Sequence, residues 1–314
     1  MMPLERPRVL AVVVTFFPKA ELLGPLLDQL SAQCAEVLIV DNTPAARDDV
    51  FAMTQGSLAV AGNCRLMRFG RNLGIAAALN AGIDVALAEH FEYVLLSDQD
   101  SLPALDMVAG LVRSERELSA LGQPVGAVGP LIRDLVTSQD YPFQAPIPGK
   151  LFYGHRFPAR EAPYVASSSI ITSGMLIPAA ALRDVGGMAE GFFIDNVDIE
   201  WCHRAIARSY RIFGTGEAVL FHRMGDDCLR IWNFGWRRVS GYGPFRLYFR
   251  FRNFVHLLRL SHVPAAWKVR ASWYMLGTLY AHAVYSHRRL ASLRAIAWGI
   301  WDGVAGRLGP PRRY

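Results

Sequence analysis

The first hundred residues alternate between short apolar runs and longer helical patterns. Residues 9–15 form a continuous run rich in valine, which predicts a strand buried on both faces. Similar short runs follow at 37–40, 66–69 and 93–96. Between them, leucines recur on one face of a stretch that begins near Leu22, and the alanine-rich residues 72–88 read as a helix. This alternation predicts an α/β fold with a doubly wound, mainly parallel sheet flanked by helices.

The second half of the chain is less regular. Residues 134–168 are rich in proline, aromatic and polar residues, and we expect a long loop region that lines a site. Strand character returns at 170–177, and helical patterns occupy 199–209, 247–260 and 265–289. We therefore expect a catalytic domain over residues 1–230 and a helical, basic C-terminal extension over residues 231–314.

Charge is distributed unevenly along the chain. Residues 1–203 hold 14 Lys and Arg against 23 Asp and Glu, a net charge of −9, whereas residues 204–314 hold 19 against 4, a net charge of +15. A basic, aromatic-rich tail suits nucleic acid, anionic lipid head groups or a phosphorylated substrate. No nucleic-acid-binding motif accompanies the charge, so a nucleic-acid partner is not expected.

The composition also bears on the compartment. The four cysteines lack CxxC spacing and are typical of small core residues in a reducing environment. The N-terminal residues do not resemble a secretory signal. The longest apolar stretch, at 273–285, has 13 residues, well short of the roughly 20 needed to span a bilayer. We expect a cytoplasmic protein.

Polar residues stand at the ends of three predicted strands, at Thr15, Asp41 and Asp98. Sheets of this kind bind ligands at the carboxyl ends of their strands. Asp98 and Asp100 lie two apart, so in extended backbone both carboxylates face the same side. Paired carboxylates at such an edge suit Mg²⁺ or Mn²⁺ and a phosphate-bearing ligand. The alternative is a solvated acidic turn before Pro103.

A second acidic cluster comprises Asp195, Asp198 and Glu200. Neighbouring aromatic residues would raise a carboxylate pKa by desolvation and make a better general base. The alternative is capping of the following helix, with Asp198 as the N-cap. Three carboxylates within six residues are more than a cap needs, so the cluster predicts at least one catalytic acid or base.

Two further features are weaker when taken alone. His222 follows an apolar run and is typical of a core histidine, unless a metal site nearby gives it a ligand's role. Arg71 and Asn72 precede the alanine-rich helix, where a helix N-terminus beside glycine can bind an anion. Asn72 is equally explained as a helix cap.

With these residues in view, the chain resembles the inverting glycosyltransferases of family 2, which have the GT-A fold. It is most similar to the rhamnosyltransferases of bacterial O-antigen and capsule synthesis. The matching segments are VVVTFFP at 12–18, VDN at 40–42, NLGIAAALNAGI at 72–83, LLSDQDS at 95–101, ITSGMLI at 171–177, FFIDNVDIEWCHRA at 192–205, LFH at 220–222 and FRN at 251–253.

The resemblance implies a role for each candidate residue. Residues near the nucleotide would be Thr15, Asp41, Asn42, Arg71 and Asn72. Asp98 would contact ribose or metal, Asp100 would be the principal metal ligand, and His222 would complete the metal shell. Counting six residues back from Arg204 makes Asp198 the general base. Val197 replaces the family's usual acid before it, which leaves Asp195 as an alternative base. Glu200 fills the second acidic position.

The implied reaction is an inverting displacement that uses a divalent cation, Mg²⁺ or Mn²⁺. The implied donor is dTDP-L-rhamnose, and the acceptor is a lipid-linked glycan at the inner membrane face. Tail arginines would then rest on lipid head groups, or else be solvated beside aromatics that pack on the catalytic domain; they are Arg237, Arg238, Arg246, Arg250 and Arg252. The competing functions are a transferase of the same fold that uses a UDP-hexose, and a non-catalytic glycan- or lipid-binding protein.

Overall fold

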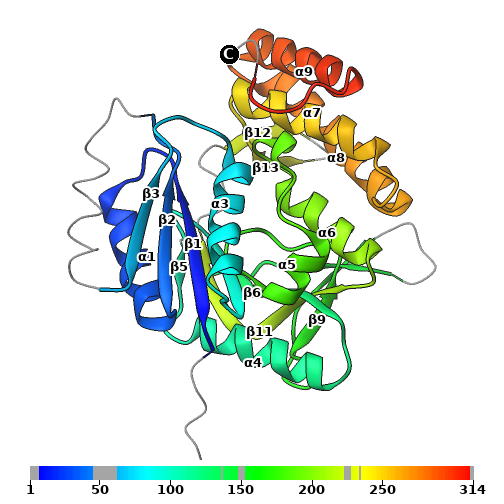
Figure 1. The fold of residues 1–314 in the computed structure, drawn as a ribbon. Helices are drawn as coiled ribbons and strands as arrows, with labels where there is room; N and C mark the ends of the chain where they lie inside the picture. Colours follow the sequence, from blue (N-terminus) through cyan, green and yellow to red (C-terminus); the bar gives the residue numbers. More distant parts are fainter. Residues whose placement is uncertain are drawn as a thin grey trace, which may run out of the picture.

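The computed structural model describes residues 7–44, 62–135, 137–147, 153–222, 228–232 and 235–311. Its centre is a nine-stranded sheet in the order β3-β2-β1-β4-β10-β6-β11-β5, with β9 paired to β11, and helices lie on both of its faces (Figure 1). The first four strands along the chain pair in parallel; they are β1 (Val9–Thr15), β2 (Glu36–Asp41), β3 (Cys64–Arg68) and β4 (Tyr93–Asp98). Their carboxyl ends therefore meet at one edge.

The other half of the sheet is mixed. The strands there are β5 (Leu102–Pro103), β6 (Val125–Asp134), β9 (Tyr164–Ser167), β10 (Met175–Pro178) and β11 (Arg211–His222). β10 runs antiparallel between β4 and β6, whereas β11 is parallel to β6. The short β5 pairs antiparallel to the end of β11, and this pairing brings the segment after β4 beside the segment that ends at His222.

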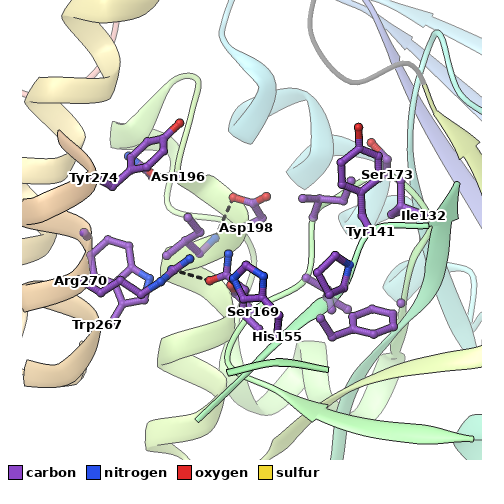
Figure 2. Close-up of a pocket in the computed structure, with 18 of the residues that line it drawn as sticks. Ile132, Tyr141, His155, Ser169, Ser173, Asn196, Asp198, Trp267, Arg270 and Tyr274 are labelled. Carbon is purple, nitrogen blue, oxygen red and sulfur yellow. Dashed lines mark hydrogen bonds between the residues drawn. The ribbon is translucent and has the colours of Figure 1, made fainter. Parts of the chain in front are cut away.

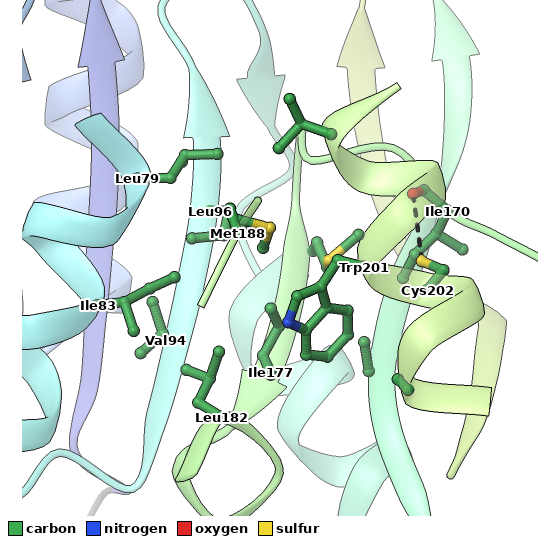
Figure 3. Packing of buried hydrophobic residues seen from close by; sticks show 14 of the residues in the cluster. Leu79, Ile83, Val94, Leu96, Ile170, Ile177, Leu182, Met188, Trp201 and Cys202 are labelled. Carbon is green, nitrogen blue, oxygen red and sulfur yellow. Dashed lines mark hydrogen bonds between the residues drawn. The ribbon is translucent and has the colours of Figure 1, made fainter. Parts of the chain in front are cut away.

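Each face of the sheet has its own core. Along β1, Leu10, Val12 and Val14 point into the cluster that also holds buried side chains of α3 (Ile75–Ala88), α5 (Ala179–Val185) and α6 (Val197–Ala207) (Figure 3). The alternate residues, Val9, Ala11 and Val13, belong to the cluster under α1 (Ala20–Gln33) and α4 (Met107–Ala120). Burial on both faces explains why this strand is apolar at every position rather than at every second one.

The chain then forms two hairpins and a helical end. β7 (Phe143–Pro146) pairs with β8 (Tyr153–Arg156), and β12 (Cys228–Trp232) pairs with β13 (Trp236–Ser240). The helices α7 (Pro244–Arg259), α8 (Ala265–Tyr285) and α9 (Arg289–Val304) pack on one another at one end of the molecule (Figure 1). The expected boundary at residue 230 lies inside β12. Within the described residues, no helix combines the length and hydropathy needed to cross a membrane.

The predicted fold class is confirmed: an α/β sheet with helices on both faces and a helical C-terminal end. Several local expectations are wrong. The alanine-rich helix begins at Ile75 instead of Asn72, and the strand expected from Ile170 begins only at Met175. The region 134–168 contains β7, β8 and β9, each only four residues long, so none spans enough positions to show a period of two.

Candidate active site

The carboxyl ends of β1 and β2 converge on Asp41. Its Oδ1 accepts hydrogen bonds from Thr15 Oγ1 at 3.0 Å, from Thr43 Oγ1 at 2.7 Å and from the Thr43 backbone N–H at 3.1 Å. The side chain is fully buried, and its Oδ2 has no hydrogen-bond partner among the described residues. Arg68 Nε lies 3.8 Å from that oxygen. One carboxylate oxygen thus holds the loop, while the other lies within ion-pair distance of Arg68.

Asn42 ties this edge to the start of α3. Its Nδ2 donates to the Gly74 carbonyl at 2.9 Å, and its Oδ1 accepts from the Leu73 N–H at 2.9 Å. Asn72 does not cap the helix, because Gly74 occupies the N-cap and Asn72 Oδ1 accepts instead from the Gly74 N–H at 2.9 Å. Arg71 is exposed beside these residues. Hydrogen bonds therefore connect the loops after β1 and β2 with the loop before α3, and the predicted nucleotide-binding residues lie in and around these loops.

The segment after β4 is fixed to the end of β1 by Gln99. Its Oε1 accepts from the Phe16 N–H at 2.8 Å, and its Nε2 donates to the Phe16 carbonyl at 3.1 Å. The two flanking aspartates differ in their surroundings. Asp98 accepts a hydrogen bond from Ser173 Oγ, whereas Asp100 is exposed. Asp98 is thus partly committed to a protein partner on the loop before β10.

His222 lies next to the Asp98–Asp100 segment. Phe221 pairs with Leu102 across β5, and continuing this register places His222 opposite Ser101, one residue past Asp100. The Nδ1 of His222 is buried and has no hydrogen-bond partner among the described residues. An unsatisfied buried imidazole nitrogen is suited to a ligand that the protein alone does not supply.

These residues fit a divalent cation that is shared with a bound phosphate. In the part of the chain that the structure describes, no group of three His, Cys, Asp or Glu side chains gathers to hold a metal ion. Mg²⁺, however, usually binds through one or two carboxylates together with substrate phosphates and water. Asp100 and the buried nitrogen of His222 match such an incomplete protein shell, although residues 223–227, directly after His222, lie outside the described chain.

Asp198 lies in the first turn of α6, where it lines a cavity of about 450 Å³. Its Oδ1 accepts from the Ile199 N–H at 2.8 Å. Its pKa is raised to about 6, chiefly by burial and to a lesser extent by the negative charges of Asp195 and Asp98, while the bond from Ile199 opposes the shift. Figure 2 shows Asp198 between Tyr274 and Arg270 on one side and Ser173 and Tyr141 on the other.

The other two carboxylates of the acidic cluster are paired with cations. The side chain of Asp195 is 5% exposed, and its Oδ1 lies 3.2 Å from both Arg246 Nε and Arg250 Nη1. The buried Glu200 binds Arg204 through both oxygens at 2.9 Å, and His262 Nε2 lies 3.2 Å from its Oε1. Among the described residues, Asp198 alone of the three has no cationic partner. No side chain caps α6, whose N-cap is Asn196.

The backbone before Asp198 is held in an unfavourable conformation. Phe193, Asp195 and Asn196 have φ values of 63°, 63° and 64°, in the left-handed region that residues other than glycine seldom adopt. Such residues persist only where the surrounding structure fixes them, and they concentrate at functional sites. The loop from Phe193 to Asn196 is therefore a built feature, and its restraints come from α7.

Arg252 and Asn253 of α7 supply those restraints. Arg252 Nη2 donates to the carbonyls of Gly191 and Phe192 at 3.0 and 2.9 Å. Asn253 Nδ2 lies 2.9, 2.7 and 2.9 Å from the carbonyls of Phe192, Ile194 and Asp195. Both side chains are fully buried. The expectation that Arg252 rests on lipid head groups is therefore wrong, because its guanidinium is used inside the protein.

Gly74 brings α3 against the same loop. Its φ is 88°, and a Cβ there would lie 2.6 Å from Phe193 Cδ2 and 2.7 Å from the Phe193 carbonyl oxygen. The Phe193 carbonyl also accepts from the Ile75 N–H at 2.7 Å. Only glycine fits this close approach. The start of α3 therefore packs directly against the loop from Phe193 to Asn196, although Gly74 and Phe193 are 119 residues apart in the sequence.

The cavity at Asp198 is lined mainly by apolar and aromatic side chains. α8 contributes Trp267, Arg270 and Tyr274, and the strand region opposite contributes Tyr141 (Figure 2). Arg270 Nη1 donates to Gln144 Oε1 at 2.6 Å and is held in place by this bond. A pocket that combines aromatic stacking surfaces with a few polar groups is typical of a site for a sugar or another small ligand.

Some of these residues carried no sequence signal for their position. Ser173 and Asn253 were visible only as members of the motifs ITSGMLI and FRN, and Gln99 only as the middle of LLSDQDS. Trp267, Arg270 and Tyr274 lie on a helix whose pattern does not reveal what it faces. Long-range packing brings them to Asp198, and a single sequence contains no direct record of that packing.

Comparisons with known proteins agree with this architecture. Residues 11–124 match the model of glycosyl transferase family 2. Over 308 residues, the chain is 28% identical to the dTDP-rhamnosyl transferase RfbF of Shigella flexneri, and the match covers 97% of this chain and 98% of that protein.

Two solved structures have a similar fold. One is the mannosyltransferase PcManGT of Pyrobaculum calidifontis, in complex with GDP-Man and Mn²⁺, with a TM-score of 0.58 and 20% identity over 96% of this chain and 76% of that one. The other is GalNAc-T7 with UDP, GalNAc and Mn²⁺, with a TM-score of 0.62 and 12% identity over 98% of this chain and 59% of that one. This likeness confirms the predicted GT-A-type fold.

Proposed function

We propose that this chain, a glycosyltransferase of family 2 with a GT-A-type fold, transfers L-rhamnose from dTDP-L-rhamnose to a hydroxyl group of a glycan with inversion at the anomeric carbon. The observation that carries the mechanism is the placement of an unpaired, half-buried carboxylate, Asp198, beside the strand edge that bears Asp98 and Asp100. The donor identity is supported by the named relative, which is similar over nearly its whole length.

The nucleotide of the donor is assigned to the loop system around Asp41. Thr15 and Thr43 hold one oxygen of Asp41, and Arg68 lies 3.8 Å from the other, so the carboxylate is fixed at the edge where a ribose or base would bind. Asn42 and Asn72 shape the loop before α3. Arg71, exposed in the loop that precedes this helix, is positioned to meet a phosphate.

The diphosphate is assigned to the Asp98–Asp100 segment. Asp100 and His222 are the residues that would hold a divalent cation, with Asp98 as a nearby carboxylate whose position Ser173 fixes. When bound, Mg²⁺ or Mn²⁺ neutralises the charge of a departing nucleoside diphosphate without any proton transfer. Gln99 keeps the whole segment fixed against β1.

Asp198 is the general base in this proposal. The Ile199 N–H holds Oδ1, which leaves Oδ2 to take the proton from the acceptor hydroxyl. With a pKa of about 6, the carboxylate is ionised at neutral pH but more basic than an ordinary aspartate. Asp195 and Glu200 position the loop and helix around it through their cationic partners. The cavity beside Asp198 holds the acceptor glycan, which we take to be lipid-linked.

Donor turnover tests the proposal. Purified protein with Mg²⁺ or Mn²⁺ is incubated with dTDP-L-rhamnose or with UDP-hexoses, and the released nucleoside diphosphate is measured; the Asp100→Asn variant serves as the control for specific turnover. We expect dTDP-L-rhamnose to be preferred by at least roughly tenfold, equivalent to about 1.4 kcal/mol. Turnover of UDP-sugars alone would refute the rhamnosyl assignment. Turnover of no donor, with or without extracted glycan, would favour a non-catalytic binding protein.

A further inference from the structure

The outward face of α8 is apolar along most of its length. Of its eight exposed residues, none is charged. Trp273 is 71% exposed and Leu276 is 56% exposed, values far above those of core side chains. We call the exposed row along the helix the α8 stripe; it consists of Val269, Trp273, Leu276, Tyr280 and Val284. Exposed large apolar side chains that gather in this way mark an interaction surface.

The cations of α8 do not interrupt the stripe. Lys268 Nζ donates to the Leu260 carbonyl at 2.8 Å, and Arg270 is bonded to Gln144 beside the cavity. Exposed cations instead gather where the helix ends, at Arg288 and Arg289. An apolar helical face with aromatic side chains and flanking cations has the chemistry of a helix that lies in a membrane interface.

The surrounding charge favours an anionic partner. Residues 228–314 contain 15 Lys and Arg but a single acidic residue, Asp302. That residue is buried and accepts a hydrogen bond from Tyr248 Oη at 2.8 Å. A second copy of the chain docked on the same face would bring like charges together, with no exposed carboxylate in this region to offset them. An anionic lipid surface removes that repulsion and covers the apolar row.

We propose that the α8 stripe docks this protein on an anionic membrane surface, with α8 lying in the interface and not crossing it. The stripe borders the cavity, because Tyr274 lines the cavity and is itself exposed. Docking through the stripe therefore brings the opening beside Asp198 close to the lipid surface. The further consequence, that an acceptor carried on a lipid enters there, rests on the proposed function; the docking itself does not.

Vesicle flotation tests this surface without any donor or acceptor. The intact protein is mixed with vesicles of phosphatidylcholine alone, or of phosphatidylcholine with phosphatidylglycerol, and the bound fraction is measured. The test variant combines Trp273→Glu with Leu276→Glu. The matched control is Leu121→Glu, a change of an exposed leucine at the end of α4, away from α7–α9 (Figure 1). Circular dichroism establishes that each variant is folded.

We expect the wild-type protein and the control to float with the anionic vesicles only. We expect the double variant to bind these vesicles at least roughly tenfold more weakly. The proposal is overturned if the wild-type protein ignores anionic vesicles, or if the double variant binds them as well as the wild type does. It is also overturned if sedimentation shows a wild-type dimer that the double variant dissociates while neither protein binds lipid. Donor turnover is measured separately, so failure of the rhamnosyl proposal leaves this result unaffected.

Discussion

At the scale of single residues, the acidic cluster shows how surroundings divide the work among similar side chains. Asp195 and Glu200 are fixed by arginines, whereas Asp198 faces the cavity with only a backbone N–H on one oxygen. The sequence singled out all three, but nothing in their spacing told which would be left unpaired. The partners Arg246 and Arg250 come from α7, about fifty positions further along the chain.

Replacing Asp198 with asparagine removes the proposed general base and keeps the size of the side chain. We expect kcat to fall by about 10²–10⁴-fold, the usual contribution of general base catalysis. Because the pKa of Asp198 in the fold, about 6, is above the 3.8 of an unperturbed aspartate, the native state binds this proton more tightly than the unfolded chain does. The stability due to that proton is present below about pH 4 and is lost as the pH rises through about 6.

The asparagine variant should therefore be at least as resistant to urea as the wild-type protein at neutral pH. Kinetics and urea unfolding on the same preparation check both expectations. Loss of activity together with a large loss of stability would point to a structural role for Asp198 instead.

The same group predicts the pH dependence of the reaction. Protonated Asp198 cannot accept the hydroxyl proton, so we expect kcat/KM to be level near neutral pH and to fall about tenfold per pH unit below about pH 6. A pH series of initial rates measures this fall. The residual activity of Asp198→Asn is the control and should not show the same fall at low pH. A rate that stays constant down to about pH 5 is incompatible with this base.

At the scale of elements, the loop from Phe193 to Asn196 depends on two side chains of the distant helix α7. Three residues of the loop have positive φ, and Arg252 with Asn253 holds its carbonyls. The strands β1, β2 and β4 were predictable from sequence because each is apolar on both faces. The restraint of the loop by Arg252 and Asn253 was not predictable, because an arginine and an asparagine in an amphipathic helix are normally solvated. Only the tertiary fold shows that both are fully buried.

The role of Asn253 in positioning the loop can be distinguished from the purely structural role of another asparagine. Asn253→Ala removes one donor group from three carbonyls, and we expect it to cost about 1–3 kcal/mol of unfolding free energy and to lower kcat. Asn63→Ala is the matched control, since Asn63 Nδ2 also approaches three carbonyls, those of Ser31, Cys34 and Ala35, away from the site. It should lose stability but keep kcat. Equal kcat losses in the two variants would show that Asn253 has no special role in positioning the loop.

At the scale of the whole molecule, the sequence predicted the sheet and the edge where the candidate residues gather, but not how the C-terminal helices are used. It suggested that arginines of α7 face lipid, whereas the structure places Arg252 inside and pairs Arg246 and Arg250 with Asp195. The docking of α8 against α6 also buries His203, a residue with no sequence signal. Its ring packs edge-on against Trp267, with centroids 5.4 Å apart.

This contact predicts acid sensitivity of the fold. Burial, reinforced by nearby His262, lowers the pKa of His203 to about 4, and neither of its ring nitrogens has a hydrogen-bond partner among the described residues. The unfolded chain takes up this proton near pH 6.5 while the fold resists it, so stability falls as the pH drops from about 6.5 towards 4.

His203→Leu should reduce that loss by about 2 kcal/mol at about pH 5, measured as the change in urea unfolding free energy from neutral pH. The same change at His287, which is exposed, should leave the pH dependence as it is. An identical pH dependence in wild type and His203→Leu would contradict the assignment.

A crystal structure of the protein with dTDP and Mn²⁺ tests the central claim most directly, because it locates the nucleotide, the cation and the base together. We predict the nucleobase and ribose of the nucleotide at Thr15, Asp41 and Asn42, and the cation between Asp100 and the diphosphate. We also predict that Asp198 faces an open cavity beside them. A nucleotide bound in the cavity at Asp198, or a cation bound away from Asp100, would contradict the assignment of donor and acceptor sites.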